Sequence, residues 1–417
     1  MGCGKSLETK EKKIHFIDDI DYRDKYEFIS ILGKGGFGEV RLYHKKGDVN
    51  ALYAIKTIFK SGNKDIKLKY KEVEILSKLD HPNIVKYYES YEESAFIHLV
   101  MEYVNGYNLL KMISAKEIYR EQDIAEIIYR LSMTISYIHT KGLVHRDIKA
   151  ENILFSDCND FSSLKLIDFG LAIESYGKER LKAGTLRYIS PEMIKGKFYP
   201  KTDCWSIGVL LYFMSTGKYP FDGENIIDYI ELGKYNKKLL LTYNLSQELI
   251  DLIESLIIVD IDKRLSVEEI LNHDFLKIRD KDTKVINSNV IETMKLFSEK
   301  SYFDKQILYY LAKLQNNDDV KELNDLFLQF DTKNDGIISF SEFQKAMHHI
   351  NKKINNPEVK KIFDDLDFNH KGFINYSQFI ASVSDNLVIF LNYFRISSEM
   401  NKYLPYLINL IMIIQVL

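Results

Sequence analysis

The chain has 417 residues, which is long enough for more than one domain, because a typical domain takes roughly 100–200 residues. Hydrophobic residues at 46% and charged residues at 28% are typical of a globular protein, and a net charge of −3 gives no basic footprint for nucleic acid. There is no stretch of about 20 apolar residues and no apolar core of a secretory signal. We therefore expect a cytoplasmic protein that does not bind nucleic acid.

The first segment, residues 1–25, is charged and shows no clear periodicity, so we interpret it as a tail. It opens with Met-Gly-Cys-Gly-Lys-Ser, in which Gly2 fits the acceptor of an N-myristoyl group and Cys3 is placed for palmitoylation. Stable anchoring takes two acyl chains, because a single myristoyl chain binds membranes only marginally. We expect an acylated tail that holds the protein at the cytoplasmic face of a membrane, and the alternative is an unmodified, disordered tail.

Short runs of β-branched and aromatic residues follow, and these predict strands. The runs cover residues 28–32, 39–43, 52–58 and 97–101, and a helical pattern at 69–79 interrupts them. From about residue 109 to residue 276 helical patterns dominate, for example at 124–139 and 245–259. The pattern predicts a sheet-rich lobe followed by a helical lobe, an α+β fold class.

A glycine-rich turn joins the first two predicted strands. It supplies Gly33, Gly35, Gly36 and Gly38, with Val40 following. A backbone without side chains can approach phosphate groups closely. In dinucleotide-binding folds the last glycine of such a motif opens a helix, whereas a strand pattern follows here. The pattern therefore favours the phosphate-binding loop of a kinase.

The next candidate residues are Ala54 and Lys56, on a predicted strand from which a lysine can pair with the α- and β-phosphates of ATP. A glutamate on the predicted helix can hold that lysine in place. Glu72 and Glu74 are both candidates, and the apolar pair at residues 75 and 76 favours Glu72 as the one that faces inward.

The remaining reacting groups lie in His-Arg-Asp-Ile-Lys-Ala-Glu-Asn, residues 145–152, and in the Asp-Phe-Gly that begins at Asp168. Phosphoryl transfer needs a metal ion to neutralise the phosphate oxygens and a carboxylate to orient the attacking hydroxyl. These needs assign Asn152 and Asp168 to Mg²⁺, Asp147 to the hydroxyl and Lys149 to the γ-phosphate.

These motifs resemble the eukaryotic protein kinase family over residues 26–276. The resemblance implies a bilobal fold in which Met101 lines the back of the adenine pocket and Glu102 and Val104 belong to the hinge that binds adenine. Lys149, two residues beyond Asp147, is the form found in serine/threonine kinases.

Residues 331–342 match the twelve-residue calcium loop of an EF-hand, with Gly336 at its sharp turn. The expected calcium ligands are Asp331, Asp335, the Ile337 carbonyl, Ser339 through a water molecule, and the bidentate Glu342. Lys333 replaces a usual oxygen ligand, so the affinity should fall. A second loop, residues 367–378, has Lys371 at position five and Gln378 at position twelve, and we expect it to be mainly a structural partner.

A kinase followed by EF-hands resembles the calcium-dependent protein kinases of plants and protists, whose members usually carry four EF-hands. The resemblance implies an autoinhibitory junction at 277–318 and an all-α EF-hand pair at 319–385. Residues 386–417 form an atypical apolar tail, with Glu399 as its one acid. A misread gene end and an apolar docking segment both remain open for that tail.

We therefore predict a calcium-regulated serine/threonine kinase that acts on protein substrates, uses ATP, Mg²⁺ and Ca²⁺, and works as a monomer. Calcium would withdraw the junction from the substrate cleft. Two alternatives remain: a kinase that no longer responds to calcium because its EF-hand loops have degenerated, and a catalytically dead calcium-sensing scaffold. Retention of Lys56, Asp147, Asn152 and Asp168 argues against the scaffold.

Overall fold

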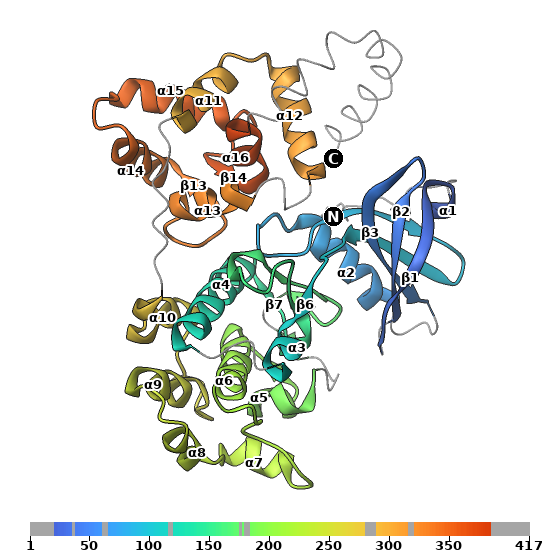
Figure 1. The fold of residues 1–417 in the computed structure, drawn as a ribbon, viewed down its shortest axis with the longest axis vertical. Coiled ribbons are helices and arrows are strands. Elements are labelled where there is room, and N and C mark those ends of the chain that lie inside the picture. Colours follow the sequence, from blue (N-terminus) through green and yellow to red (C-terminus); the bar gives the residue numbers. More distant parts are fainter. Residues whose placement is uncertain are drawn as a thin grey trace, which may run out of the picture.

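The computed structural model describes residues 21–35, 38–60, 66–115, 120–174, 177–178, 184–279, 289–315 and 321–384. These residues form a sheet-rich lobe, a helical lobe and a separate helical module at one end of the molecule (Figure 1). The predicted α+β class is confirmed. Within these ranges we find no helix that combines the length and the apolar character needed to cross a bilayer.

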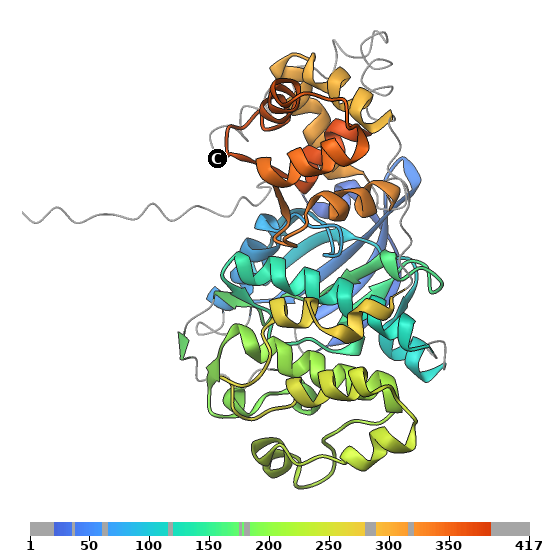
Figure 2. The ribbon, with the colours of Figure 1, turned by 90° about the vertical axis from the view of Figure 1, so that its left-hand side faces the viewer.

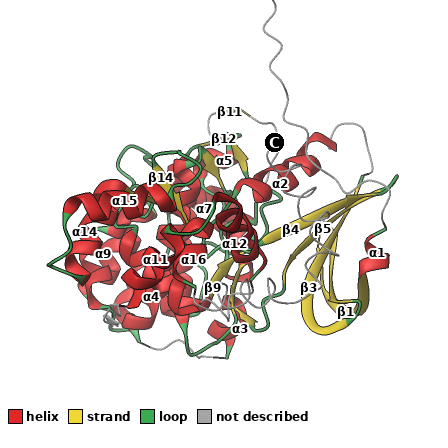
Figure 3. Ribbon diagram, turned by 90° about the horizontal axis from the view of Figure 1, so that it is seen from above, coloured by secondary structure: helices red, strands yellow, loops and turns green. Residues whose placement is uncertain are grey.

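The N-terminal lobe is built on an antiparallel sheet with the strand order β1-β2-β3-β5-β4. Its strands are β1 (Tyr26–Gly35), β2 (Gly38–Lys45), β3 (Asp48–Phe59), β4 (Tyr87–Glu92) and β5 (Phe96–Glu102). They extend beyond the apolar runs that predicted them, because main-chain pairing continues through polar residues and reaches Gly35 and Gly38 at the turn. The helices of this lobe are α1 (Tyr22–Lys25) and α2 (Ile66–Lys78). Figure 3 shows the sheet at one side of the molecule and most of the helices at the other.

The C-terminal lobe is mainly helical. Its α-helices are α3 (Leu109–Ser114), α4 (Glu121–Thr140), α5 (Pro191–Ile194), α6 (Pro200–Thr216), α7 (Ile226–Leu232), α8 (Lys237–Thr242), α9 (Gln247–Leu256) and α10 (Val267–Leu271). Its short 3-10 helices are η1 (Ala150–Asn152), η2 (Phe161–Ser163), η3 (Leu186–Tyr188) and η4 (Asp274–Ile278). Its short strands are β6 (Tyr107–Asn108), β7 (Leu143–Val144), β8 (Ile153–Phe155), β9 (Leu164–Leu166), β10 (Ile173–Glu174), β11 (Gly177–Lys178) and β12 (Lys197–Phe198). Helix α6 is buried on almost every side and forms the centre of the lobe.

A buried ion pair ties α5 to the segment that precedes α10. Arg264 is fully buried, and its Nη1 and Nη2 atoms donate to the two carboxylate oxygens of Glu192 at 2.6 and 3.0 Å. The guanidinium also lies 5.0 Å from the ring centroid of Trp205. Removing one partner of such a pair is strongly destabilising, because the other charge stays buried without compensation.

We expect Glu192→Ala to lower the free energy of unfolding of this lobe by about 3–5 kcal/mol. Trp205 is the one tryptophan of the chain, so its fluorescence during urea unfolding reports directly on this lobe. Asp274→Asn is the matched control, because Asp274 pairs with Lys277 on the surface and exposed pairs contribute at most about 1 kcal/mol. An equal, small loss in both variants would contradict a structural role for the buried pair.

The third part contains two junction helices and two helix–loop–helix units. Its elements are α11 (Asn289–Ser298), α12 (Tyr302–Leu314), α13 (Lys321–Phe330), β13 (Ile337–Ser339), α14 (Phe340–Ile350), α15 (Asn356–Leu366), β14 (Phe373–Asn375) and α16 (Tyr376–Val383). Strands β13 and β14 pair antiparallel and join the two loops. One hydrophobic core holds the whole part together, and it includes Ile291 and Phe297 of α11 and Leu308 of α12. In this conformation the junction packs into the EF-hand module.

The EF-hand module also rests on the two kinase-like lobes (Figures 1 and 2). At the start of β4, Lys86 Nζ donates to the carbonyls of Ala312 and Gln315 at 3.2 and 3.0 Å, and so caps the C-terminal end of α12. In a second contact, the amide and hydroxyl of Ser377 in α16 both donate to the Asp80 carboxylate, at 3.1 and 2.8 Å. The module therefore has defined anchor points on the lobes.

Candidate active site

Lys56 occupies the central strand of the N-terminal sheet, where it pairs with Val40 on one side and Leu99 on the other. Its Nζ lies 2.6 Å from Glu72 Oε1 and 2.7 Å from Asp168 Oδ1. Burial alone would lower the pKa of Lys56, but the two carboxylates outweigh burial and raise it above its ordinary value. The lysine is therefore charged.

Of the two candidate glutamates, the structure turns Glu72 toward Lys56. Glu74 instead pairs with Lys78 across one turn of α2, at 2.5 Å on the surface. Burial by itself would raise the pKa of Asp168, but the neighbouring Lys56 holds it below its ordinary value. Asp168 is thus an anion at neutral pH, as a metal ligand must be.

Asp147 lies in the segment between β7 and η1, and both of its carboxylate oxygens accept hydrogen bonds. Oδ1 accepts from the amide and the hydroxyl of Thr185, at 3.2 and 3.0 Å. Oδ2 accepts from Lys149 Nζ at 2.6 Å and from Asn152 Nδ2 at 3.1 Å. Because Lys149 also donates to Thr185 Oγ1 at 3.0 Å, these four side chains form one network.

A second carboxylate positions the loop that carries Asp147. Asp203, which is fully buried in α6, accepts from the amides of His145 and Arg146, both at 2.9 Å. Arg146 has a φ of 66° and Asp168 a φ of 62°, so both non-glycine residues adopt the left-handed conformation. Such residues persist where surrounding contacts hold them, and they are concentrated at functional sites.

Two of the residues predicted to lie near adenine are on neighbouring strands of the N-terminal sheet. Ala54 of β3 pairs with Met101 of β5 in the sheet register, and Val104 is the second residue after β5 ends. The side chain of Glu102 takes part in a different contact, because its Oε2 lies 3.2 Å from Lys165 Nζ and accepts from the amide of Lys86 at 3.1 Å. These contacts connect Glu102, a predicted hinge residue, to Lys165 and Lys86.

The glycine-rich turn is described up to Gly35 and again from Gly38. Gly33 pairs with Val40, and Gly35 pairs with Gly38. Gly38 has a φ of 142°, and a Cβ atom there would lie 2.1 Å from the Thr57 carbonyl oxygen. Only glycine fits this close approach. Gly36 lies outside the described residues, as do Gly2 and Cys3.

The oxygen atoms of this site fit Mg²⁺. Within the described residues the hydrogen bonds of Asp168 fall on Oδ1, and those of Asn152 use its amide nitrogen. This leaves Asp168 Oδ2 and Asn152 Oδ1 as hard oxygen ligands, the type that Mg²⁺ prefers. There Mg²⁺ would neutralise the negative charge of the phosphate oxygens.

The first EF-hand loop keeps the backbone form that the sequence predicts. Asn334 and Gly336 have positive φ values of 56° and 73°, and the Asp331 carboxylate accepts from the amides of Asp335 and Gly336 at 3.2 and 2.7 Å. Burial raises the pKa of Asp331 to about 7, and the nearby carboxylates of Asp335 and Glu342 add to the effect. The charges of these three carboxylates therefore act on one another in this loop.

In this structure the acidic side chains of the loop are not arranged around a common point as metal ligands would be. Glu342 Oε1 accepts from the amide of Lys333 at 3.0 Å, and Oε2 accepts from the amide and hydroxyl of Ser339 at 3.0 and 2.5 Å. In the described part of the chain no three acidic, histidine or cysteine side chains are gathered closely enough to hold a metal ion. The expected carbonyl ligand, Ile337, lies at the start of β13. Calcium coordination therefore requires Glu342 to release these contacts.

In the second loop, the glutamine at position twelve makes structural hydrogen bonds. Gln378 Nε2 donates to the carbonyl of Leu366 at 3.3 Å, and its Oε1 accepts from the amide of Asn375 at 3.0 Å. The amide thus closes the loop at the position where a bidentate glutamate would bind calcium. This contact agrees with the expected structural role.

Comparison with known proteins adds independent findings. Residues 26–276 match the family model of the protein kinase domain, and residues 310–384 match that of the EF-hand domain pair. Calcium-dependent protein kinase 4 of Plasmodium falciparum is 32% identical over 397 residues, which cover 89% of this chain and 75% of the relative. Its counterpart in Plasmodium berghei is 34% identical over the same shares. Calcium-dependent protein kinase 3 of Plasmodium berghei is 32% identical over 85% of this chain and 65% of the relative.

The chain belongs to the calcium-dependent protein kinase family. The expected family and enzyme class are thereby confirmed: this is a serine/threonine protein kinase that uses ATP and Mg²⁺ and carries an EF-hand pair for Ca²⁺. The lipid modifications, the cellular location and the monomeric state stay predictions.

Thr185 and Asp203 are parts of the kinase site to which the sequence motifs assigned no role. Thr185 was missed because it follows Asp147 by 38 positions and joins it only through the tertiary fold. Asp203 stands in an Asp-Cys-Trp-Ser-Ile-Gly motif, which is visible in the sequence, but its contacts with the amides of residues 145 and 146 are not. Both residues position Asp147.

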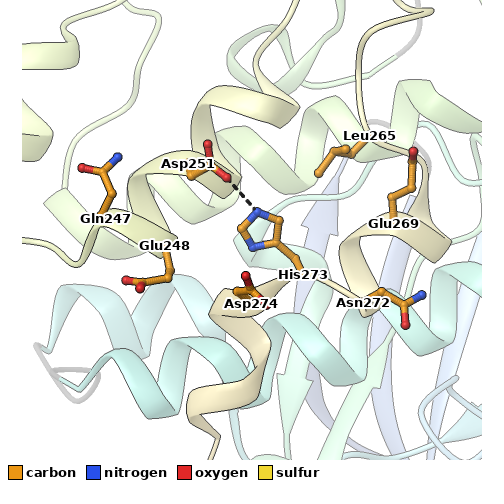
Figure 4. Close-up of a pocket in the computed structure, with 8 residues that line it drawn as sticks. All are labelled: Gln247, Glu248, Asp251, Leu265, Glu269, Asn272, His273 and Asp274. Atoms are coloured by element: carbon orange, nitrogen blue, oxygen red, sulfur yellow. Dashed lines mark hydrogen bonds and ion pairs between the residues drawn. The ribbon is translucent and has the colours of Figure 1, made fainter.

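A surface pocket of about 390 Å³ lies between α9, α10 and η4 in the C-terminal lobe of the kinase (Figure 4). Its lining includes His273, whose Nε2 lies 3.2 Å from Asp251 Oδ2. None of the catalytic or nucleotide-binding residues lines this pocket. It is therefore separate from the phosphoryl-transfer site.

Proposed function

We propose that this calcium-regulated kinase transfers the γ-phosphate of ATP to serine and threonine hydroxyls of proteins, under control of calcium bound at its first EF-hand loop. Two observations support the catalytic part of the proposal: the ion pair between Lys56 and Glu72, and the hydrogen bonds that hold Asp147 in place. Positioned charges supply most of the catalysis in phosphoryl transfer, because the protein has little covalent chemistry to perform.

Each side chain has a separate task. Asp147 accepts the proton of the substrate hydroxyl and aims its oxygen at the γ-phosphate, and Lys149 balances the charge of that phosphate. Lys56 holds the α- and β-phosphates while Glu72 keeps the lysine extended. Asn152 and Asp168 supply the oxygen ligands for Mg²⁺. Thr185 limits the motion of Asp147 and Lys149 by bonding to both.

The control part rests on the first loop and the junction. In this structure the junction helices are buried against α15 and α16, which supports the idea that the EF-hand module can hold the junction away from the substrate cleft. We infer an equilibrium between this arrangement and one in which the junction covers the cleft, and calcium shifts that equilibrium by binding one state more tightly. Phosphorylation of a generic peptide in chelator and in saturating calcium tests the proposal, and equal rates would favour the calcium-independent alternative.

We expect Gly2→Ala to release the kinase from membranes, because stable anchoring takes two acyl chains and this variant lacks the acceptor of the myristoyl group. Cys3→Ser should weaken the association without abolishing it, since one myristoyl chain binds marginally. Fractionation of cells that express each variant measures both effects. Unchanged membrane association of Gly2→Ala would place the anchor elsewhere.

We also propose that the kinase is a monomer, and light scattering of the purified protein tests this.

A further inference from the structure

A short helix beside the catalytic aspartate carries an exposed arginine. Thr185 donates to Asp147 through its amide and its hydroxyl, and Leu186 and Arg187 follow it directly in η3. Because successive Cα atoms are about 3.8 Å apart, the Arg187 Cα lies within about 8 Å of that of Thr185. A substrate in an extended conformation advances about 3.3 Å per residue. The Arg187 side chain can therefore reach a substrate residue a few positions from the hydroxyl that Asp147 orients.

The backbone of η3 is fixed by its last residue, Tyr188, which is buried. The Tyr188 hydroxyl accepts from the amide of Ala150 at 3.4 Å, and its carbonyl accepts from the Ser206 hydroxyl at 3.0 Å. Its ring also meets the ring of Tyr219 edge to face, with centroids 5.6 Å apart. The arginine before it thus extends from a rigid support.

The guanidinium of Arg187 rests on an aromatic platform. Its Cζ atom lies 4.6 Å from the ring centroid of Tyr219, and that ring stacks on the ring of Phe213 with centroids 4.2 Å apart. Phe213 is buried in α6, so the platform is part of the core of the lobe. A guanidinium that packs on an aromatic ring is held in place while its N–H groups stay available to a carboxylate.

In the described part of the chain the acid that pairs with Arg187 is Asp222, whose two oxygens accept from Nη2 at 3.2 and 3.3 Å. The two side chains are 46% and 60% exposed. Such an exposed pair contributes little stability, so another carboxylate can replace Asp222. Asp222 also accepts from the amide of Gly223 at 2.9 Å and keeps this partner when the arginine leaves.

We propose that Arg187, supported by Tyr219, is a specificity-determining residue that binds an acidic side chain of the protein substrate close to the phosphorylated serine or threonine. The inference rests on the proposed function, because it requires a kinase that acts on peptides. The substrate class is protein segments with an aspartate or glutamate within about four residues of the phosphoacceptor. A lysine at the same substrate position is rejected by the like charge. Asp222 holds the arginine until the substrate arrives.

Peptide phosphorylation by the full-length kinase in saturating calcium tests the proposal. The peptides contain one serine, and aspartate, alanine or lysine is placed in turn at each position within four residues of that serine. At the position that meets Arg187, we expect kcat/KM to be about two- to fivefold higher for aspartate than for alanine, mainly through KM. The ratio of the two values cancels any general loss of activity in a variant.

Substitutions of Arg187 should change this ratio according to their charge. Arg187→Gln should bring it close to one, and Arg187→Glu should reverse it, so that the lysine peptide becomes the best of the three. Arg187→Lys should retain part of the preference, because the charge remains but the planar group that packs on Tyr219 is lost. The wild-type ratio should fall as salt is raised, because an exposed pair is screened.

Two further variants separate this role from a general effect of charge. Asp222→Asn should raise the preference for aspartate, because it removes the competing carboxylate while its side-chain oxygen can still accept from Gly223. Lys46→Gln removes an exposed charge from the turn between β2 and β3, at the end of β2 that is remote from the glycine-rich turn. It should keep the wild-type ratio.

The outcomes distinguish the two levels of argument. Absence of phosphate transfer to every peptide would overturn the proposed function and this inference with it. Transfer without a preference for aspartate at any position, or a preference that Arg187→Glu leaves unchanged, would overturn the inference alone. A lower preference for aspartate in Asp222→Asn would also contradict it.

Discussion

Asp147→Asn is expected to lower kcat by about 10²- to 10⁴-fold, the range associated with loss of a general base. The amide can still occupy the space between Thr185 and Lys149, but it cannot accept the proton of the substrate hydroxyl. KM for ATP should change little, because Lys56, Asn152 and Asp168 remain. Peptide phosphorylation under saturating ATP and Mg²⁺ measures the effect.

The matched control is Asp157→Asn, an exposed position in the same lobe whose carboxylate caps the amide of Asn159. This variant should retain the wild-type rate, since asparagine can make the same cap. Circular dichroism should show that both variants are folded. A rate of Asp147→Asn close to that of the wild type would rule out the assigned mechanism and favour a different base.

Glu342→Gln is expected to remove most of the calcium activation while leaving the rate in chelator unchanged. In the EF-hand the twelfth residue supplies a bidentate carboxylate from the outgoing helix, here α14. When Glu342 leaves the backbone amides of Lys333 and Ser339 for the metal, α14 has to reorient relative to α13. A glutamine can accept on one of these two sides alone, because its amide nitrogen only donates, and it supplies only one neutral oxygen ligand.

Glu322→Gln is the control for this prediction, because Glu322 is exposed on α13 of the same hand and contributes no loop ligand. It should respond to calcium as the wild type does. Full activation of Glu342→Gln would show that calcium acts through another site, and the second loop would then be the first to test. Lack of activation of the wild type would instead support the calcium-independent alternative.

A chain ending at Arg279 tests autoinhibition separately from calcium binding. It keeps the contact of Arg279 with the ring of Tyr129, at 3.3 Å, and removes the junction and the EF-hands. If the junction restrains the kinase, this shortened chain should be faster than the full-length protein in chelator. A shortened chain that is no faster would argue against restraint by the junction.

The sequence by itself determined the chemistry of both sites. Phosphate binding, proton acceptance and metal ligation each need particular side chains at a fixed local spacing. Such a spacing can be recognised directly in the amino-acid sequence. For this reason the residue order alone predicts the roles of Lys56, Asp147, Asn152 and Asp168, and also the ligands of the loop at 331–342. Alternating and helical periodicity predicted the α+β class for the same local reason.

Only the tertiary structure decided how these parts face one another. Glu72 and Glu74 stand on the same helix, and the choice between them depends on how that helix is rotated against the sheet that carries Lys56. The places of Thr185 and of the junction helices depend on contacts between residues far apart in the chain. Such contacts arise from the packing of whole elements, and local residue spacing carries no information about them.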